Sequence, residues 1–160
     1  LRDGGAQDIA ALQQLNYTVG SGGYTNSTTP SIWPSKGVIT SPYGSRIDPV
    51  TGASSAFHEG IDIADDYGTS IVATAAGTVT IAGYTDGGYG NLVEIDHGNG
   101  FVTRYGHNSA VLVTPGMSVK QGQVIALMGS TGKSTGAHVH YEVRINGTAV
   151  DPMVFLPISN

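Results

Sequence analysis

The sequence predicts an all-β protein that folds as an antiparallel sheet or sandwich. Runs of alternating apolar and polar residues are short and are separated by Gly, Asn and Asp, as expected for strands joined by tight turns. The chain has 24 glycines among 160 residues, and only 12% of its residues are charged. Both values suit a compact, turn-rich β domain better than a helical one. The alternating runs cover residues 70–75, 77–82, 92–96, 101–105, 124–128 and 138–145.

The first 31 residues differ in composition from the rest of the chain. Residues 8–15 predict a short helix with Asp8 as its cap, because apolar residues recur there at the spacing of one helix face. Residues 18–31 are rich in Gly, Ser and Thr and lack periodicity, which is typical of a flexible linker. We therefore expect an N-terminal helix and linker over residues 1–31 and one domain over residues 32–160.

Residues 57–64 predict a strand that carries two candidate metal ligands. His58 and Asp62 are four residues apart, so they would share a face on a strand and also on a helix. Gly60 and the two isoleucines that flank Asp62 favour the strand, on which the glycine would leave room between the ligands. The competing helix resembles the His-Glu-x-x-His helix of zinc proteases, with Glu59 as general base, but no helical periodicity continues beyond Asp62.

Residues 138–145 predict a second strand with one functional face. Apolar Val, Tyr and Ile alternate there with polar residues, so His138 and His140 point to the same side. Glu142 shares that side, and two interpretations are open for it. It either forms a hydrogen bond to an imidazole or is an ordinary surface carboxylate.

His58, Asp62 and His140 form a suitable ligand set for Zn²⁺, which in catalytic sites takes three protein ligands and keeps one position open. Water in that position would have a pKa of about 7, and the metal would polarise a substrate carbonyl. His107 and His138 remain for proton transfer and oxyanion stabilisation. From its sequence context alone, His107 fits an ordinary loop histidine equally well, because it follows a glycine.

Several other polar residues give weaker signals. His97 lies in a Gly- and Asn-rich segment that predicts a hairpin turn, so we interpret it as a loop residue outside the site. Arg46 either holds a substrate carboxylate or lies in a solvated turn. Asn16 or Asn26 of the predicted linker could fill the fourth metal position, a hypothesis that rests on no motif.

Composition argues against some functions and partners. The net charge of −5 gives no basic surface for nucleic acid. The chain has no cysteine for disulfides or thiolate metal ligands. It contains no signal peptide and no apolar run of about 18 residues that would span a membrane. Because it begins with Leu1, as a processed product would, we expect export or membrane-anchoring segments upstream.

A series of motifs in this chain resembles those of the lysostaphin/LytM-type zinc endopeptidases, which cleave the peptide part of bacterial peptidoglycan. The resemblance covers residues 33–156, and its ordered motifs are far more specific than a single His-x-His. The motifs are SPYGSRIDP at 41–49, FHEGIDIA at 57–64, VATAAG at 72–77, GYGN at 88–91, IDHGNG at 95–100, YGH at 105–107, GSTGKSTG at 129–136 and HVHYE at 138–142.

The resemblance implies a fold, a reaction and roles for five residues. The fold would be the lysostaphin-type (duplicated hybrid motif) peptidase domain. The reaction would be zinc-dependent hydrolysis of peptide bonds in peptidoglycan stem peptides or cross-bridges, by attack of metal-activated water. His58, Asp62 and His140 would bind one zinc ion per chain, and His107 and His138 would be catalytic. Such a protein would act in the extracytoplasmic cell envelope, either secreted or membrane-anchored.

Two other functions and the identity of the cleaved bond stay open. Some relatives have lost ligands and act as silent wall-binding or hydrolase-activating domains, but all five expected residues are present here. A lipoyl-carrier-like domain, modified on Lys120 or Lys133, is a further alternative. The glycines of loops 82–91 and 130–136 suit a groove for Gly or D-Ala residues, although glycine in loops also serves turn geometry.

Overall fold

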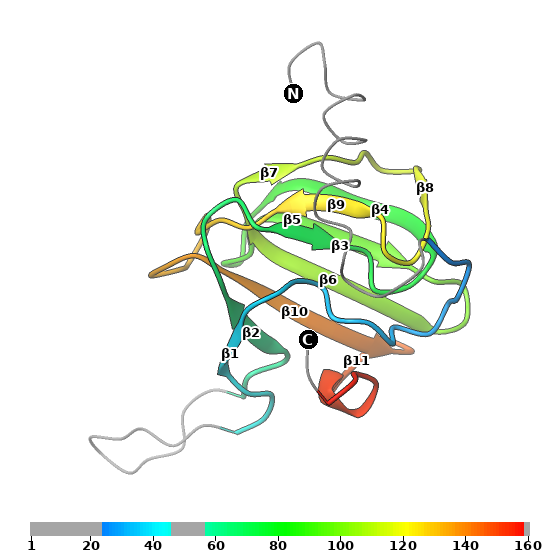
Figure 1. Ribbon diagram of the computed structural model, residues 1–160, viewed down its shortest axis with the longest axis horizontal. Coiled ribbons are helices and arrows are strands. Elements are labelled where there is room, and N and C mark those ends of the chain that lie inside the picture. The colour runs from blue at the N-terminus through cyan, green and yellow to red at the C-terminus, as the bar shows by residue number, and fades with distance from the viewer. Residues whose placement is uncertain (1–23, 46–56, 159–160) are drawn as a thin grey trace.

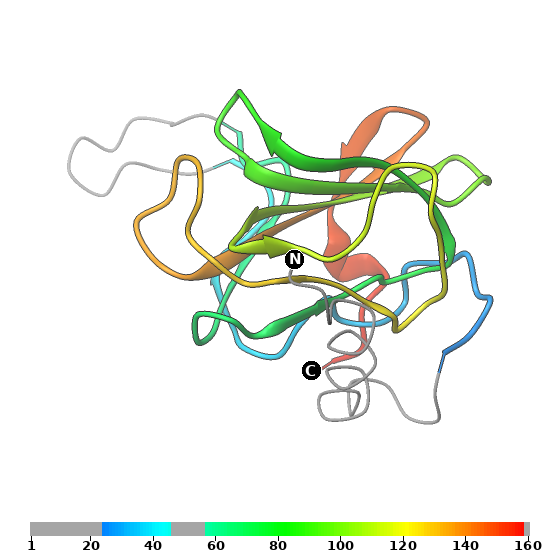
Figure 2. The same cartoon turned by 90° about the horizontal axis from the view of Figure 1, so that it is seen from above.

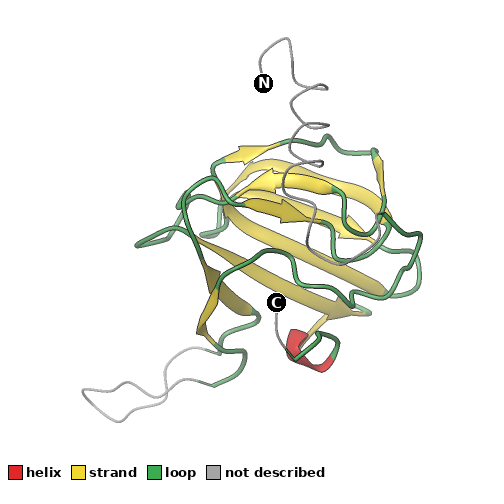
Figure 3. Cartoon of the chain, in the orientation of Figure 1, coloured by secondary structure: helices red, strands yellow, loops and turns green. Residues whose placement is uncertain are grey.

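The computed structural model describes residues 24–45 and 57–158. Regular structure in these ranges is almost entirely strand, with one short 3-10 helix, η1 (Pro152–Val154), near the C-terminus (Figure 3). The all-β prediction is therefore confirmed. The predicted helix at 8–15 lies outside the described residues, as do Asn16 and Arg46. Within the described part, no helix has the length and hydropathy needed to cross a membrane.

The strands form two antiparallel sheets (Figure 1). The large sheet has the order β1-β2-β10-β6-β5-β4-β8, with β11 paired to β10, and the small sheet has the order β3-β9-β7. The large sheet consists of β1 (Val38–Ser41), β2 (Ile61–Ala64), β4 (Gly77–Thr85), β5 (Gly90–Asp96), β6 (Phe101–Asn108), β8 (Ser118–Val119), β10 (His138–Ile145) and β11 (Thr148–Val150). The small sheet consists of β3 (Ser70–Val72), β7 (Ala110–Val111) and β9 (Val124–Leu127).

One face of the large sheet packs toward the small sheet and forms the core. Along β10, Val139, Tyr141 and Val143 are fully buried, because alternate side chains of a strand point to the same side. Ile71 of β3 and Ile125 of β9 belong to the same apolar cluster. The opposite face of β10 is thereby left for His138, His140 and Glu142.

A chain of hydrogen bonds runs through this apolar core. The hydroxyl of Thr74 lies 2.7 Å from that of Tyr141 and 3.0 Å from that of Tyr105. The Tyr105 hydroxyl in turn lies 2.7 Å from Oγ1 of Thr103, which is 2.9 Å from Nε2 of His97. His97 therefore lies in the β5–β6 connection as expected, but it is buried and bonded on both ring nitrogens. Its role is structural, since buried polar groups need such partners.

The segment around His58 differs in detail from its prediction. The strand β2 begins only at Ile61, and His58 instead forms an isolated bridge with Gly44. Gly60 does not provide room between ligands, because a Cβ atom there would clash with the carbonyl oxygen of Tyr141 on β10. Its missing side chain therefore serves the close approach of the two chain segments.

The described end of the predicted linker is held against the domain. Backbone hydrogen bonds join Thr25 and Gln121 in both directions, at 2.9 and 3.2 Å, and Ser27 accepts one from Ala76 at 2.7 Å. The side chain of Asn99 also donates to Thr28. Residues 24–28 thus follow a path fixed by the sheet, and the domain boundary near residue 32 stays a prediction.

The core network gives a testable prediction about stability. Thr74→Val keeps the volume of the side chain but leaves the Tyr141 hydroxyl buried without its partner in the described structure. We expect the free energy of unfolding, measured by urea denaturation, to fall by about 2 kcal/mol. The control is Thr80→Val, which removes an exposed hydroxyl bonded to Glu94 and should cost less than about 0.5 kcal/mol. Equal losses for the two variants would contradict a stabilising role for the network.

Candidate metal centre

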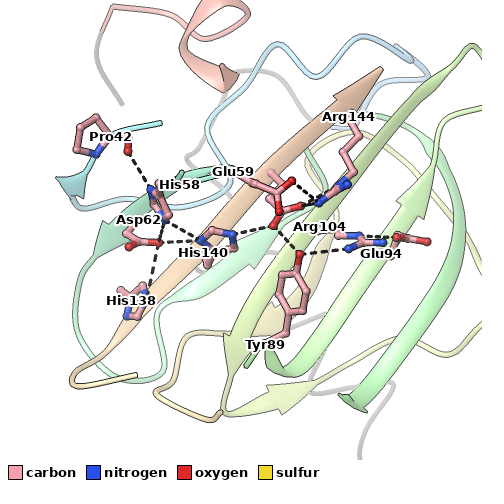
Figure 4. Close-up of polar contacts among 11 residues, drawn as sticks. Pro42, His58, Glu59, Asp62, Tyr89, Glu94, Arg104, His138, His140 and Arg144 are labelled. Atoms are coloured by element: carbon pink, nitrogen blue, oxygen red, sulfur yellow. Dashed lines mark hydrogen bonds and ion pairs between the residues drawn. The ribbon is translucent and has the colours of Figure 1, made fainter. Parts of the chain in front are cut away.

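Three neighbouring strands bring the candidate residues to one face of the large sheet (Figure 4). Asp62 of β2 lies directly opposite His140 of β10, and Gly106 of β6 lies opposite His140 on the other side. Directly opposed residues of an antiparallel pair have neighbouring side chains, so the carboxylate meets the imidazole. His58 joins them from the segment before β2, which is fixed by two backbone hydrogen bonds of 2.9 Å to Gly44.

Three ligand atoms of this group form a compact triangle. Nε2 of His58 lies 3.2 Å from Nδ1 of His140 and 3.4 Å from Oδ1 of Asp62. The third distance, between Nδ1 of His140 and Oδ1 of Asp62, is 2.9 Å. A tetrahedral zinc ion with ligands at about 2.0–2.1 Å holds its ligand atoms about 3.3 Å apart. The triangle therefore has the dimensions of a zinc site. Over residues 24–45 and 57–158, no other group of three or more His, Asp or Glu residues has ligand atoms close enough to hold a metal ion.

Hydrogen bonds behind the two imidazoles orient them toward this triangle. The backbone carbonyl of Pro42 accepts a hydrogen bond from Nδ1 of His58 at 2.8 Å, which leaves Nε2 with its lone pair facing the group. Nε2 of His140 lies 2.8 Å from Oε2 of Glu142 and donates to it, so Nδ1 is the nitrogen that could bind a metal. The two histidines therefore present different nitrogens to the same point.

Glu142 is a buried partner of His140 and not a surface carboxylate. Only 1% of the residue is exposed, and it also accepts hydrogen bonds from the Tyr89 hydroxyl at 2.6 Å and from Nε of Arg144 at 2.8 Å. Burial by itself would raise the pKa of Glu142, but the bonds from His140, Tyr89 and Arg144 lower it to about 2. Arg104 donates to the Tyr89 hydroxyl at 3.1 Å and extends the network (Figure 4).

Burial and hydrogen bonding also have opposite effects on the pKa values of Asp62 and His140. Burial by itself would raise the pKa of Asp62, but the hydrogen bonds and charges of His140 and His58 outweigh it and hold that pKa well below its usual range. Burial by itself would lower the pKa of His140, yet its bonds to Asp62 and Glu142 raise it to about 9. In the metal-free group His140 thus carries a proton between two carboxylates, and a metal ion at Nδ1 would replace that proton.

His107 and His138 lie beside the triangle as a pair. Their ring centroids are 4.6 Å apart, and Nε2 of His138 lies 3.8 Å from Oδ1 of Asp62. Nδ1 of His107 is 2.7 Å from the carbonyl oxygen of Thr131, and Nδ1 of His138 is 2.9 Å from that of Gly136. Both Nδ1 atoms therefore donate to backbone carbonyls and both Nε2 atoms keep a lone pair. Burial and the neighbouring His138 lower the pKa of His107, which keeps its ring neutral at pH 7.

These residues lie in an open groove of about 610 Å³. The groove is lined by the four candidate histidines, by Asp62 and by parts of the two loops that were expected as its walls. The lining residues are Phe57, His58, Glu59, Asp62, Gly87, Gly88, Tyr89, His107, Lys133, Ser134, Thr135, His138, His140 and Glu142. The loop that leads into β10, drawn gold to orange, projects from the body of the molecule (Figure 2). The groove is large enough for several residues of an extended peptide.

The glycines of the two wall loops allow the loops to interlock. A Cβ atom on Gly90 would clash with the backbone of Thr131 and Gly132, and one on Gly132 would clash with the backbone of Gly90. Both glycines also have positive φ angles, 67° and 73°. The loops are therefore one packed unit in which Gly90 and Gly132 serve backbone geometry.

The sequence does not predict several residues that complete the site. Tyr89 and Arg144 bind Glu142, and the carbonyl groups of Pro42 and Thr131 orient His58 and His107. Only Tyr89 could have been found from the sequence, because it lies in the GYGN motif. The contacts of backbone carbonyls cannot be predicted from residue types. Asn26, in contrast, lines a separate hollow with His97 and Lys120.

Curated relatives match most of this chain over a small part of their own length. DD-carboxypeptidase/endopeptidase Mpg from Neisseria meningitidis serogroup B is 48% identical over 120 residues, which cover 74% of this chain and 27% of that protein. Murein hydrolase activator NlpD from Escherichia coli K12 is 42% identical over 125 residues, which cover 78% of this chain and 31% of that protein. The chain thus spans about a quarter to a third of the length of these relatives.

Solved structures share the fold. A zinc-containing peptidase from Vibrio cholerae superposes with a TM-score of 0.70 at 35% identity, covering 81% of this chain and 40% of that one. The catalytic domain of the antimicrobial peptidase lysostaphin from Staphylococcus simulans superposes with a TM-score of 0.66 at 33% identity, covering 74% of this chain and 90% of that one. The expected lysostaphin-type fold is therefore confirmed. Since the model of peptidase family M23 also matches residues 56–152, more than half of the chain, this protein belongs to peptidase family M23.

Proposed function

We propose that this domain is a zinc-dependent endopeptidase that hydrolyses peptide bonds of bacterial peptidoglycan. The observation that carries the proposal is the triangle formed by His58, Asp62 and His140, whose edges of 2.9, 3.2 and 3.4 Å suit one zinc ion. Membership of peptidase family M23 and the name of the relative from Neisseria, a carboxypeptidase and endopeptidase, support the reaction class.

In this proposal Nε2 of His58, Oδ1 of Asp62 and Nδ1 of His140 hold the ion. When bound, zinc supplies Lewis-acid polarisation of the scissile carbonyl and of the water that attacks it. Asp62 offsets one of the two metal charges and the neutral imidazoles offset none, so the centre stays positive. That net charge favours the negative charge that develops on the carbonyl oxygen during attack.

His107 and His138 carry the protons in the proposed reaction. Each has Nδ1 occupied by a backbone carbonyl, so Nε2 is the atom that exchanges a proton. The lowered pKa of His107 keeps that ring neutral and able to accept the proton from attacking water. Nε2 of His138, 3.8 Å from Oδ1 of Asp62, can donate to the oxyanion or to the departing amine once it has accepted a proton.

A second candidate function is a silent domain that binds the cell wall or activates another hydrolase. It is favoured by one observation, the 42% identity to a relative named as a murein hydrolase activator. Against it stands the presence of all five metal-binding and catalytic candidates in one groove. The lipoyl-carrier alternative loses its support with the family membership.

We further propose that the substrate consists of peptidoglycan peptides and that the domain works in the extracytoplasmic cell envelope, either secreted or anchored. The names of the relatives, a wall peptidase and an activator of murein hydrolases, motivate both points. An open groove with small residues in its walls agrees with a peptide substrate of small side chains.

The proposal makes a prediction that separates metal binding from proton transfer. His58→Ala removes one of three ligands, so we expect zinc content and hydrolysis of purified sacculi to be lost together. His138→Ala removes no proposed ligand, so it should keep about one zinc per chain while turnover falls at least about 100-fold. Zinc is measured by elemental analysis and turnover by mass spectrometry of released peptides. Stoichiometric zinc in His58→Ala would contradict its role as a ligand, and absence of hydrolysis by the wild-type protein would favour the silent domain.

A further prediction concerns the partner of His140. Glu142→Gln keeps the shape of the side chain but removes the charge that orients the imidazole, so zinc affinity should fall about 10- to 100-fold in a competition assay with a chelator. The matched control is Glu94→Gln, whose carboxylate pairs with Arg104 at 2.6 Å and does not touch His140. The zinc affinity of Glu94→Gln should differ from that of the wild-type protein by less than about threefold. Unchanged affinity in Glu142→Gln would show that the carboxylate does not orient the ligand.

A further inference from the structure

The groove contains one cationic side chain. Among its lining residues in the described part of the chain, Lys133 is the only lysine or arginine. The backbone nitrogen of Lys133 donates to the carbonyl of Gly88 at 2.9 Å, so the residue is anchored between the two interlocked wall loops. Its place at the wall is set by backbone contacts and does not depend on its charge.

The ammonium group of Lys133 has no counter-ion in the described structure, whereas the carboxylates of the groove are all engaged. Glu142 accepts from His140, Tyr89 and Arg144, and the Glu59 carboxylate lies 3.4 Å from Arg144. Asp62 faces the histidines of the triangle. No hydrogen bond or ion pair joins Lys133 to a side chain within 24–45 or 57–158, so its charge is available to a ligand.

The charge of Lys133 therefore favours an anionic group on the substrate. With the proposed zinc ion in place, the groove has two positive points, the metal with its three ligands and Lys133, whereas the Glu59 and Glu142 carboxylates pair with Arg144. A carboxylate is the anionic group that a peptide offers to an ammonium, through a charge-assisted hydrogen bond. The groove would then hold the scissile carbonyl at one positive point and a carboxylate at another.

We propose that Lys133 forms a subsite for the terminal α-carboxylate of the peptide substrate, so that the domain prefers peptides with a free C-terminus near the cleaved bond. This inference rests on the proposed function. The small residues of the walls suit glycine or alanine residues, which carry no carboxylate in their side chains. The only carboxylate that such a peptide can place in the groove is the one at its C-terminus.

The test uses the full chain loaded with zinc and two peptide scaffolds, N-acetyl-tetraglycine and diacetyl-L-lysyl-D-alanyl-D-alanine. Each peptide is prepared as the free acid and as the C-terminal amide, which differ only in the charge at that end. Hydrolysis gives kcat and KM, and calorimetry gives Kd. For at least one scaffold, we expect KM and Kd of the wild-type protein to be about tenfold lower for the free acid than for the amide.

The variants assign this preference to one side chain. Lys133→Gln should reduce the acid-to-amide ratio to about one, while Lys133→Arg, which keeps the charge, should retain most of it. The matched control is Lys120→Gln, which removes a lysine from the separate hollow at the other end of the sheet and should leave the ratio as in wild type. The subsite would be rejected if the wild-type protein had equal KM and Kd values for acid and amide. It would also be rejected if Lys133→Gln kept the wild-type ratio of these values.

Failure of the proposed function gives a different result from failure of the subsite. If no peptide is hydrolysed but the acid binds more tightly and Lys133→Gln abolishes the difference, the subsite stands and the peptidase proposal falls. If hydrolysis occurs without any preference for the acid, the peptidase stands and the subsite falls. Absence of both binding and hydrolysis for all four peptides rejects the subsite.

Discussion

The site depends on the register between β2 and β10. Asp62 meets His140 because the two residues are directly opposite, and a shift by one residue would move every side chain of β2 to the other face. Such a shift would expose Ile61 and Ile63, both of which are fully buried, and would bury the Asp62 carboxylate in their place. The apolar core therefore fixes the geometry of the polar face, since the register that buries the isoleucines is the one that assembles the triangle.

The network behind His140 explains how the protein keeps a charged group almost completely buried. An isolated buried carboxylate would be strongly destabilising, but Glu142 has three donors, two from its own strand β10 and one from a distant part of the chain. One of them, Tyr89, belongs to a wall loop, and its ring lies where a side chain on Gly106 would approach it to 3.2 Å. The same hydrogen bonds that satisfy Glu142 thus fasten the wall of the groove to the strand that carries His140.

Sequence patterns predict the long strands and the convergence of His58, Asp62 and His140, and they fail where a strand is short or a contact partner is distant in the sequence. Residues 138–145 alternate clearly, and β10 has those bounds. The strands β7 and β8 have two residues each, too few for alternation to be detectable, and are missed. His107 takes a positive φ of 66° and bonds to the carbonyl of Thr131, a backbone contact across 24 positions that no residue pattern encodes. The role given to Gly60 was wrong for the same reason, since the atom it accommodates belongs to another strand.

The distribution of charges around the groove determines the net charge that a metal ion would have in the triangle. Glu142 is balanced by Arg144, and Glu94 is balanced by Arg104. Neither pair adds net charge next to the triangle, and Glu59, the exposed carboxylate of the groove, also lies beside Arg144. Asp62 is thus the one carboxylate of the triangle that would oppose the two positive charges of a zinc ion, whereas a second carboxylate ligand would neutralise the centre and weaken its pull on a carbonyl oxygen. The arginine pairs therefore allow the buried glutamate to orient His140 without reducing the positive charge on which the proposed chemistry depends.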